Sequence, residues 1–301
     1  MIFCCDKLRT ISGELFFSIR GKHRKAEYME VVLAEYLGFC YGVKRAIKIA
    51  REHADGKSST LGPIIHNPQM VERLKNEGVG TVEDLNELEE GTVIIRSHGV
   101  GPQVYEKIKA KGLNVVDATC PKVKNAQTAA RGLVEDGYNV VIIGEKNHPE
   151  VRSIFEWANK KTTILETEDE AKNFATCPKL GIVSQTTISG THFKRMVMHL
   201  LEKSADIKIL RTICAATDQR QTAAMELASK VDAMIVVGGR NSANTTRLAR
   251  LCEEKCRTYH IETAEEILPE WFTKTKKIGI TAGASTPDWV IKEVYEKCRR
   301  I

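Results

Sequence analysis

Three cysteines stand at similar places in three parts of the chain, and together they could bind iron. Cys40, Cys120 and Cys214 are 80 and 94 positions apart, and each follows an apolar run and precedes a stretch with helical patterning. Structural zinc sites use four ligands, often in close CxxC pairs, and the sequence contains no CxxC. An iron–sulfur cluster usually takes four cysteines, so three would leave one iron open to a substrate oxygen. The spacing predicts a catalytic iron–sulfur site.

Polar residues that suit a phosphate group follow other apolar runs. His66, His98 and His148 each stand close to Gly or Pro, and Ser242 holds the matching place in the third part of the chain. Counted from the preceding cysteine, His66 lies at +26, and His148 and Ser242 both lie at +28. Imidazole, hydroxyl and amide groups offer directed donors to phosphate oxygens. We therefore expect a phosphate or diphosphate site beside the cysteines.

One carboxylate lies inside such a motif, Glu150 in the run NHPE. Beside a reducing iron centre, a carboxyl group could deliver protons. A glutamate in the first turn of a helix is also favoured by the helix dipole, and both roles can hold together.

Three repeats of one unit would position these residues. Each unit has a β-rich run, a cysteine, a helix, a second strand and a third strand. The first strands are expected in 31–40, 113–120 and 207–214, and each is expected to end at or just before its cysteine. The second strands are expected in TLGPIIHNP, NVVIIGEKNHPE and AMIVVGGRNSANT, and the third in GTVIIRSHG, KLGIVSQTT and KIGITAGAST. Ligands collect at the carboxyl ends of parallel strands, so we expect the cysteines and polar residues to converge.

This reading predicts an α/β protein of three similar βα subdomains with pseudo-threefold symmetry. The expected subdomains are residues 29–112, 113–206 and 207–301. Residues 1–28 are basic and weakly patterned, and we interpret them as an extension, either disordered or the result of an upstream start site with Met29 as the functional start. The alternative is a short docking hairpin.

Composition narrows the class of protein. The 301 residues are 42% hydrophobic and 28% charged, which is ordinary for a globular chain and excludes wholesale disorder. Nine cysteines cannot all pair, and we see no secretory signal, so we expect free thiols in the reducing cytoplasm. No apolar run approaches the roughly 18 residues of a membrane span. Cys252 and Cys256, four apart on an expected helix, are interpreted as packing residues.

Nine motifs in register, from about residue 30 to the end, resemble the 4-hydroxy-3-methylbut-2-enyl diphosphate reductase family. They are GFCYGVKRAI, HNPQMVERL, RSHGVGP, DATCPKV, GEKNHPEV, SQTT, TICAATDQRQ, GGRNSANTTRL and TAGASTPDW. The resemblance implies a trefoil of three subdomains around one [4Fe-4S] cluster, with Cys40, Cys120 and Cys214 as its ligands and one open iron. It also implies two-electron reduction of the diphosphate substrate to isopentenyl and dimethylallyl diphosphate, with loss of water.

The same resemblance implies roles for the polar residues. Glu150 matches the proton-delivering position, and the substrate-binding positions are His66, His98, His148, Thr187, Ser242, Asn244 and Ser285. Ala243 stands where many members have a second serine. A ferredoxin or flavodoxin is the implied electron donor, with neither nucleic acid nor membrane as partner.

Two other readings remain open from the residues. A three-cysteine cluster enzyme similar to quinolinate synthase would bind dicarboxylates, and basic residues would then be expected at the strand ends. A non-catalytic RNA- or zinc-binding protein is suggested by the net charge of +6, but aromatic residues make up only 6% of the chain.

Overall fold

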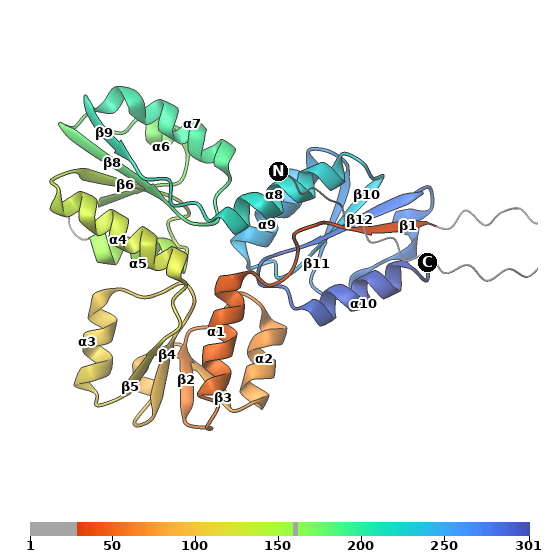
Figure 1. The fold of residues 1–301 in the computed structure, drawn as a ribbon, viewed down its shortest axis with the longest axis horizontal. Coiled ribbons are helices and arrows are strands. Elements are labelled where there is room, and N and C mark those ends of the chain that lie inside the picture. The colour runs from red at the N-terminus through yellow and green to blue at the C-terminus, as the bar shows by residue number, and fades with distance from the viewer. Residues whose placement is uncertain (1–28, 159–161) are drawn as a thin grey trace, which may run out of the picture.

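Three four-stranded parallel sheets form three lobes around a common centre (Figure 1). The computed structural model describes residues 29–158 and 162–301, so the predicted extension at 1–28 lies outside the described residues. The three sheets repeat one strand order, β3-β2-β4-β5, β7-β6-β8-β9 and β11-β10-β12-β1. The predicted α/β class and threefold repetition are therefore confirmed.

The first lobe carries the first cysteine helix. Its strands are β2 (Ser58–Leu61), β3 (Val79–Val82), β4 (Thr92–Ile95) and β5 (Asn114–Asp117). Its helices are α1 (Tyr41–Glu52), α2 (Pro68–Asn76) and α3 (Pro102–Ala110). In Figure 1, α1 begins at the centre of the molecule and runs outward.

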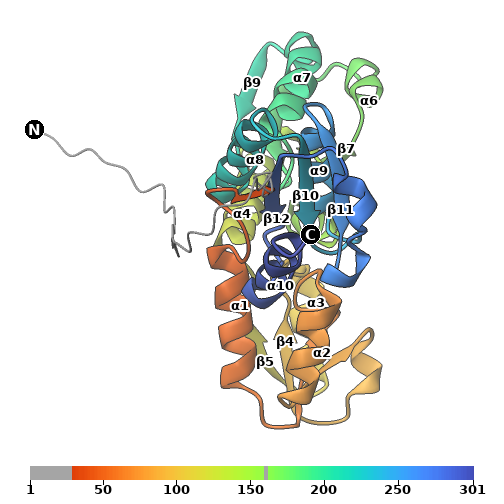
Figure 2. The ribbon, with the colours of Figure 1, turned by 90° about the vertical axis from the view of Figure 1, so that its right-hand side faces the viewer.

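The second and third lobes repeat this build. The second contains β6 (Asn139–Ile143), β7 (Thr162–Leu165), β8 (Lys179–Ser184), β9 (Asp206–Ile209), α4 (Pro121–Glu135), α5 (Pro149–Ala158), α6 (Glu168–Lys172) and α7 (Gly190–Leu200). The third contains β10 (Ala233–Val237), β11 (Arg257–Ile261), β12 (Lys277–Ala282), β1 (Glu30–Leu33), α8 (Ala215–Ala228), α9 (Ala243–Glu253) and α10 (Asp288–Cys298). In the view of Figure 2, the first lobe and the helices α6 and α7 of the second lie at opposite ends.

The strands that lead to the cysteines correct two expectations. They end at Leu33, Asp117 and Ile209, three or more residues before each cysteine, and the cysteines instead begin helices. Each of these strands also lies in a different lobe from the helix that its cysteine begins: β5 pairs with β4 of the first lobe, β9 with β8 of the second, and β1 with β12 of the third. Each expected boundary between two subdomains therefore lies one strand too early, because the strand that follows it completes the sheet of the preceding lobe.

The central strands of the second and third sheets are largely buried, as is typical of parallel sheets covered by helices on both faces. All five residues of β10 are buried, and in β6 only the first residue is partly exposed. The expected third strands are confirmed, as are the expected second strands of the second and third units. In the first unit β2 ends at Leu61, so it shares only Thr60 and Leu61 with the expected run TLGPIIHNP. One edge strand per sheet, β3, β7 and β11, was not predicted.

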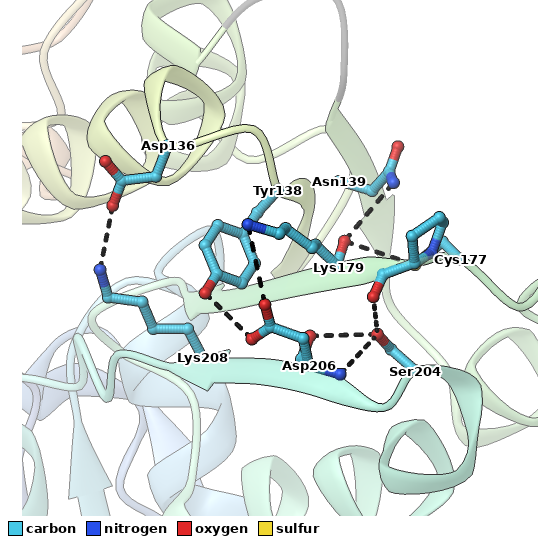
Figure 3. Close-up of polar contacts among 9 residues, drawn as sticks. Asp136, Tyr138, Asn139, Cys177, Lys179, Ser204, Asp206 and Lys208 are labelled. Atoms are coloured by element: carbon cyan, nitrogen blue, oxygen red, sulfur yellow. Dashed lines mark hydrogen bonds and ion pairs between the residues drawn. The ribbon is translucent and has the colours of Figure 1, made fainter.

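The amino ends of the second sheet's strands are joined by polar contacts (Figure 3). The Tyr138 hydroxyl donates to Asp206 Oδ1 at 3.0 Å, and the ammonium groups of Lys179 and Lys208 lie 5.4 and 5.9 Å from its ring centroid. Cys177 lies here, its Sγ 3.6 Å from the carbonyl oxygen of Lys179. These contacts are structural and lie at the opposite end of the strands from the polar motifs.

Candidate functional site

The three cysteines occupy equivalent positions, each at the N-cap of a helix. Cys40 precedes α1, Cys120 precedes α4 and Cys214 precedes α8. Each cysteine N–H donates to a backbone carbonyl just after a third strand: Cys40 to Ala284 at 3.1 Å, Cys120 to Ser97 at 2.9 Å and Cys214 to Thr186 at 2.9 Å. The positive ends of three helices are thereby turned toward the thiols, where they stabilise negative charge.

A glycine keeps the space between two of the thiols open, because a side chain at its position would enter that space. A Cβ at Gly42 would lie 2.5 Å from Cys120 Sγ and 3.9 Å from Cys40 Sγ. Burial raises the pKa of the Cys120 thiol, while backbone N–H groups of Lys122 and Val123 oppose that shift. All three thiols are free and half-buried. Gly42 therefore keeps a cradle open between two of the sulfurs.

Three histidines form the second part of the site. The ring centroids of His66 and His98 are 4.5 Å apart, and that of His148 lies 5.6 and 5.5 Å from them. Burial is the main cause that lowers the pKa of each ring: the pKa of His148 falls to about 3 and that of His98 lies well below 6.5. In the absence of an anion, the cluster is therefore neutral.

The hydrogen bonds of this histidine cluster favour an anion over a metal. One nitrogen from each ring lies within 4.8 Å of the others, which is a spacing that could hold a metal ion. However, His148 Nδ1 accepts the Glu150 N–H at 3.2 Å, so its Nε2 carries the hydrogen and is a donor. His66 Nε2 and His98 Nδ1 are buried and have no partner within the described residues. In the tautomer that puts the hydrogen on these nitrogens, they can donate to phosphate oxygens, as His148 Nε2 can.

Glu150 is a buried carboxyl group that can hold a proton near neutral pH. It lies in the first turn of α5 and is 2% exposed. Oε1 accepts the Thr186 N–H at 2.5 Å, and Oε2 accepts the Thr186 hydroxyl at 2.9 Å. Burial raises the pKa of Glu150 to about 7 against these two hydrogen bonds, which lower it. The predicted acid thus has the titration that proton transfer requires.

The other predicted binding residues lie around the same cavity of about 110 Å³. Its lining contains all the predicted site residues except Cys214: Cys40, His66, His98, Cys120, His148, Glu150, Thr187, Ser242, Asn244 and Ser285. Asn244 Nδ2 is buried and unpartnered in the described chain. Ser242 Oγ accepts the Thr245 N–H at 3.4 Å, whereas Ser285 Oγ donates to the carbonyl oxygen of His66 at 3.1 Å. Cys214 lies next to this lining, because its N–H donates to the carbonyl oxygen of Thr186, which is part of it.

A larger cavity of about 800 Å³ reaches His66 and His148 from the side of the second and third lobes. Arg247 of α9 crosses between these lobes. Its guanidinium donates to the carbonyl oxygen of Thr187 and to Glu145, both at 2.7 Å. This arginine therefore joins the lobes beside a predicted substrate contact.

Three residues of this region were not predicted as site residues: Thr186, Arg220 and Arg247. Thr186 stands next to Thr187 in SQTT, and that adjacency was the available signal. The two arginines lie in helices, where arginine is ordinarily a solvated residue, so the sequence alone offers no signal for their burial.

The packing interpretation of Cys252 and Cys256 is confirmed. Cys252 and Cys298 are fully buried in apolar clusters, and Cys256 packs against the cluster of Cys252. His260 Nε2 pairs with the carbonyl oxygen of Gly238 at 2.8 Å, which is a structural contact. Among the residues that the structure describes, no helix combines the length and apolarity of a membrane span.

Comparison with known proteins agrees with this geometry. The profile of the LytB protein family matches residues 31–299. The 4-hydroxy-3-methylbut-2-enyl diphosphate reductase of Geobacter metallireducens is 51% identical over 276 residues, covering 91% of this chain and 98% of its own. The enzyme of that name from Aquifex aeolicus is 47% identical over 280 residues, covering 91% and 97%.

Two solved structures share the fold. One is described as (E)-4-hydroxy-3-methyl-but-2-enyl diphosphate reductase, the terminal enzyme of the non-mevalonate pathway; it has a TM-score of 0.67 at 47% identity, covering 91% of this chain and 100% of its own. The reductase from Plasmodium falciparum has a TM-score of 0.86 at 30% identity, covering 89% and 87%. The chain therefore belongs to the LytB family of 4-hydroxy-3-methylbut-2-enyl diphosphate reductases, as its nine motifs predicted.

Proposed function

We propose that this chain converts (E)-4-hydroxy-3-methylbut-2-enyl diphosphate to isopentenyl and dimethylallyl diphosphate. The carbon–oxygen bond to the hydroxyl breaks, two electrons and two protons are consumed, and one water leaves. The observation that carries the proposal is a single cavity that joins two cysteine thiols, three neutral histidines and a protonatable buried carboxyl. Each part answers one need of the reaction: electrons, diphosphate binding and a proton.

The residues present fit an iron–sulfur cluster. Cys40, Cys120 and Cys214 would hold a [4Fe-4S] cluster, since three free thiols begin three helices and Gly42 leaves a cradle between two of them. When bound, such a cluster with one iron free of protein ligands supplies electrons and a Lewis-acidic position for the substrate oxygen.

The diphosphate would be held by donors that have no partner in the protein. His66, His98 and Asn244 each present a buried, unpaired polar atom within the described residues. A buried donor without a partner is costly, so an anion that accepts from all three is bound favourably. Ser242 Oγ accepts from the backbone and keeps its own hydrogen free, whereas Ser285 must turn away from the carbonyl oxygen of His66 to contribute.

Glu150 would deliver the proton with which the hydroxyl leaves as water. Thr186 holds both carboxyl oxygens, which fixes the acid in one orientation. Thr187, the next residue along the chain, is the proposed contact to the substrate hydroxyl, so acid and leaving group would lie side by side. A pKa of about 7 lets Glu150 give up its proton and take another near neutral pH.

Electrons would enter from a ferredoxin- or flavodoxin-type donor near the start of α1. Tyr41, directly after Cys40, is among the most exposed large side chains, so the cysteine end of this helix reaches the surface. The donor and the cytoplasmic location stay predictions.

Anaerobic reconstitution tests the proposal. We expect iron and sulfide uptake, a brown protein and reductive turnover of the substrate. Cys120→Ser should lose most of its iron, whereas Cys177→Ser, the control at the far end of the second sheet, should retain it. A wild-type protein that stays colourless and iron-free after reconstitution would contradict the proposal.

A further inference from the structure

A buried arginine lies beside the cysteines without a carboxylate partner. Arg220 is on α8, six positions after Cys214, and is 7% exposed. Nη1 donates to the carbonyl oxygen of Ala216 in its own helix at 3.0 Å, and Nη2 donates to that of Gly38 at 2.8 Å. Nε has no partner, and no carboxylate forms an ion pair with this guanidinium within residues 29–158 and 162–301.

This arrangement leaves a charge that needs an anion. Guanidinium stays protonated in proteins, and a buried cation that meets only neutral carbonyls is costly. Burial lowers the pKa of Arg220, and the thiols of Cys40 and Cys214 act against that shift. The counter-charge for Arg220 therefore comes from the cysteine site.

The same arginine bonds the backbone turn that precedes Cys40. The carbonyl of Gly38 lies two residues before Cys40, and Arg220 reaches it from the third lobe across 182 positions of sequence. Gly38 has a φ of +74°, and a Cβ there would lie 3.0 Å from Asp288 Oδ1 and Ile291 Cδ1, so side chains are disfavoured at this position. The turn that presents the carbonyl is thereby held in place.

We propose that Arg220 is a positioning residue of the iron–sulfur site: it fixes Cys40 relative to Cys214 and provides the buried positive charge that favours the reduced cluster. This inference rests on the proposed function. Reduction adds one electron to a cluster already bound by thiolates, and a fixed cation nearby stabilises the more negative state. Net charge and local hydrogen bonds are among the factors that set cluster potentials.

The test is a redox titration of reconstituted, cluster-loaded protein followed by electron paramagnetic resonance. We expect Arg220→Gln to lower the equilibrium constant for one-electron reduction about tenfold, which is about 59 mV. Arg220→Lys keeps the charge and should stay close to wild type. Arg131→Gln is the matched control, because Arg131 lies on another cysteine helix, α4, but pairs at the surface with Glu135. A loaded Arg220→Gln protein with the wild-type potential would refute the proposal.

Loss of iron from Arg220→Gln would also test the proposal. If Arg220→Gln folds, as circular dichroism reports, but binds no cluster while Arg220→Lys binds it normally, the charge is required and the proposal stands. Equal loss of iron in both variants contradicts a role for charge. Failure of the wild-type protein to take up iron would instead overturn the proposed function, so the two failures are distinguishable.

Discussion

Replacing Glu150 with glutamine removes a titrating group while keeping its shape. The glutamine carbonyl can still accept the Thr186 N–H, and its amide can donate to the Thr186 hydroxyl, so the local structure should persist. Iron content should therefore match the wild type. What the variant lacks is a proton to give.

The magnitude follows from the pKa. With a pKa of about 7, Glu150 is about 90% protonated at pH 6 and about 10% protonated at pH 8. Because the protonated form is the acid, wild-type turnover should fall about tenfold as the pH rises through this range. Loss of a general acid lowers a rate by roughly 10²- to 10⁴-fold, so Glu150→Gln should retain at most about 1% of turnover, with a flat profile from pH 6 to 8.

The assay is anaerobic turnover with a chemical reductant, measured per bound iron so that cluster loss is not mistaken for loss of the acid. Glu156→Gln, on the same helix α5, is the matched control and should keep both the rate and the pH slope of the wild type. A Glu150→Gln protein with full iron content and wild-type rates would refute the proton-transfer reasoning. So would a variant that keeps the wild-type pH slope.

Three further substitutions test the rest of the site. Gly42→Ala places a methyl group 2.5 Å from Cys120 Sγ and should cut iron uptake at least several-fold. The control is Gly132→Ala, at a helical glycine where an added Cβ would have nothing within 4 Å. This control should bind iron normally and gain up to about 1 kcal/mol of stability in thermal unfolding. His98→Ala removes a buried donor and should raise the KM about tenfold or more while iron content is unchanged, and an unaltered KM would contradict its role. Arg247→Gln breaks two contacts between lobes and should lower kcat/KM about tenfold with normal iron content, as steady-state kinetics would measure.

The sequence predicted the fold class and also pointed to residues that the structure brings together. The cysteines, histidines and Glu150 follow apolar runs at repeated spacing, and parallel strands must bring such positions to one edge. These local patterns are sufficient for convergence, and the structure places all of them except Cys214 around one cavity.

What the sequence could not supply depends on distant partners. An apolar run shows that a strand forms, but it does not show which sheet the strand joins. The sequence therefore did not predict that β5 pairs with β4 and β9 with β8, each in the lobe before the helix that its cysteine begins. The same limit applies to Arg220. Its burial results from the Gly38 turn of another part of the chain, and an arginine in an Ala-rich helix looks like a surface residue.

The pairing of β1 with β12 gives the molecule an order of assembly. Glu30 pairs with Lys277, 247 positions later, so β1, the first strand of the described residues, can pair only after nearly all of the chain has been synthesised. Cys40 also reaches its final position late, because its N–H donates to the carbonyl oxygen of Ala284. Cys120 and Cys214, in contrast, bond carbonyls that are synthesised before them. Two of the three cysteine positions can thus form on a growing chain, and the third is completed only when synthesis is almost finished.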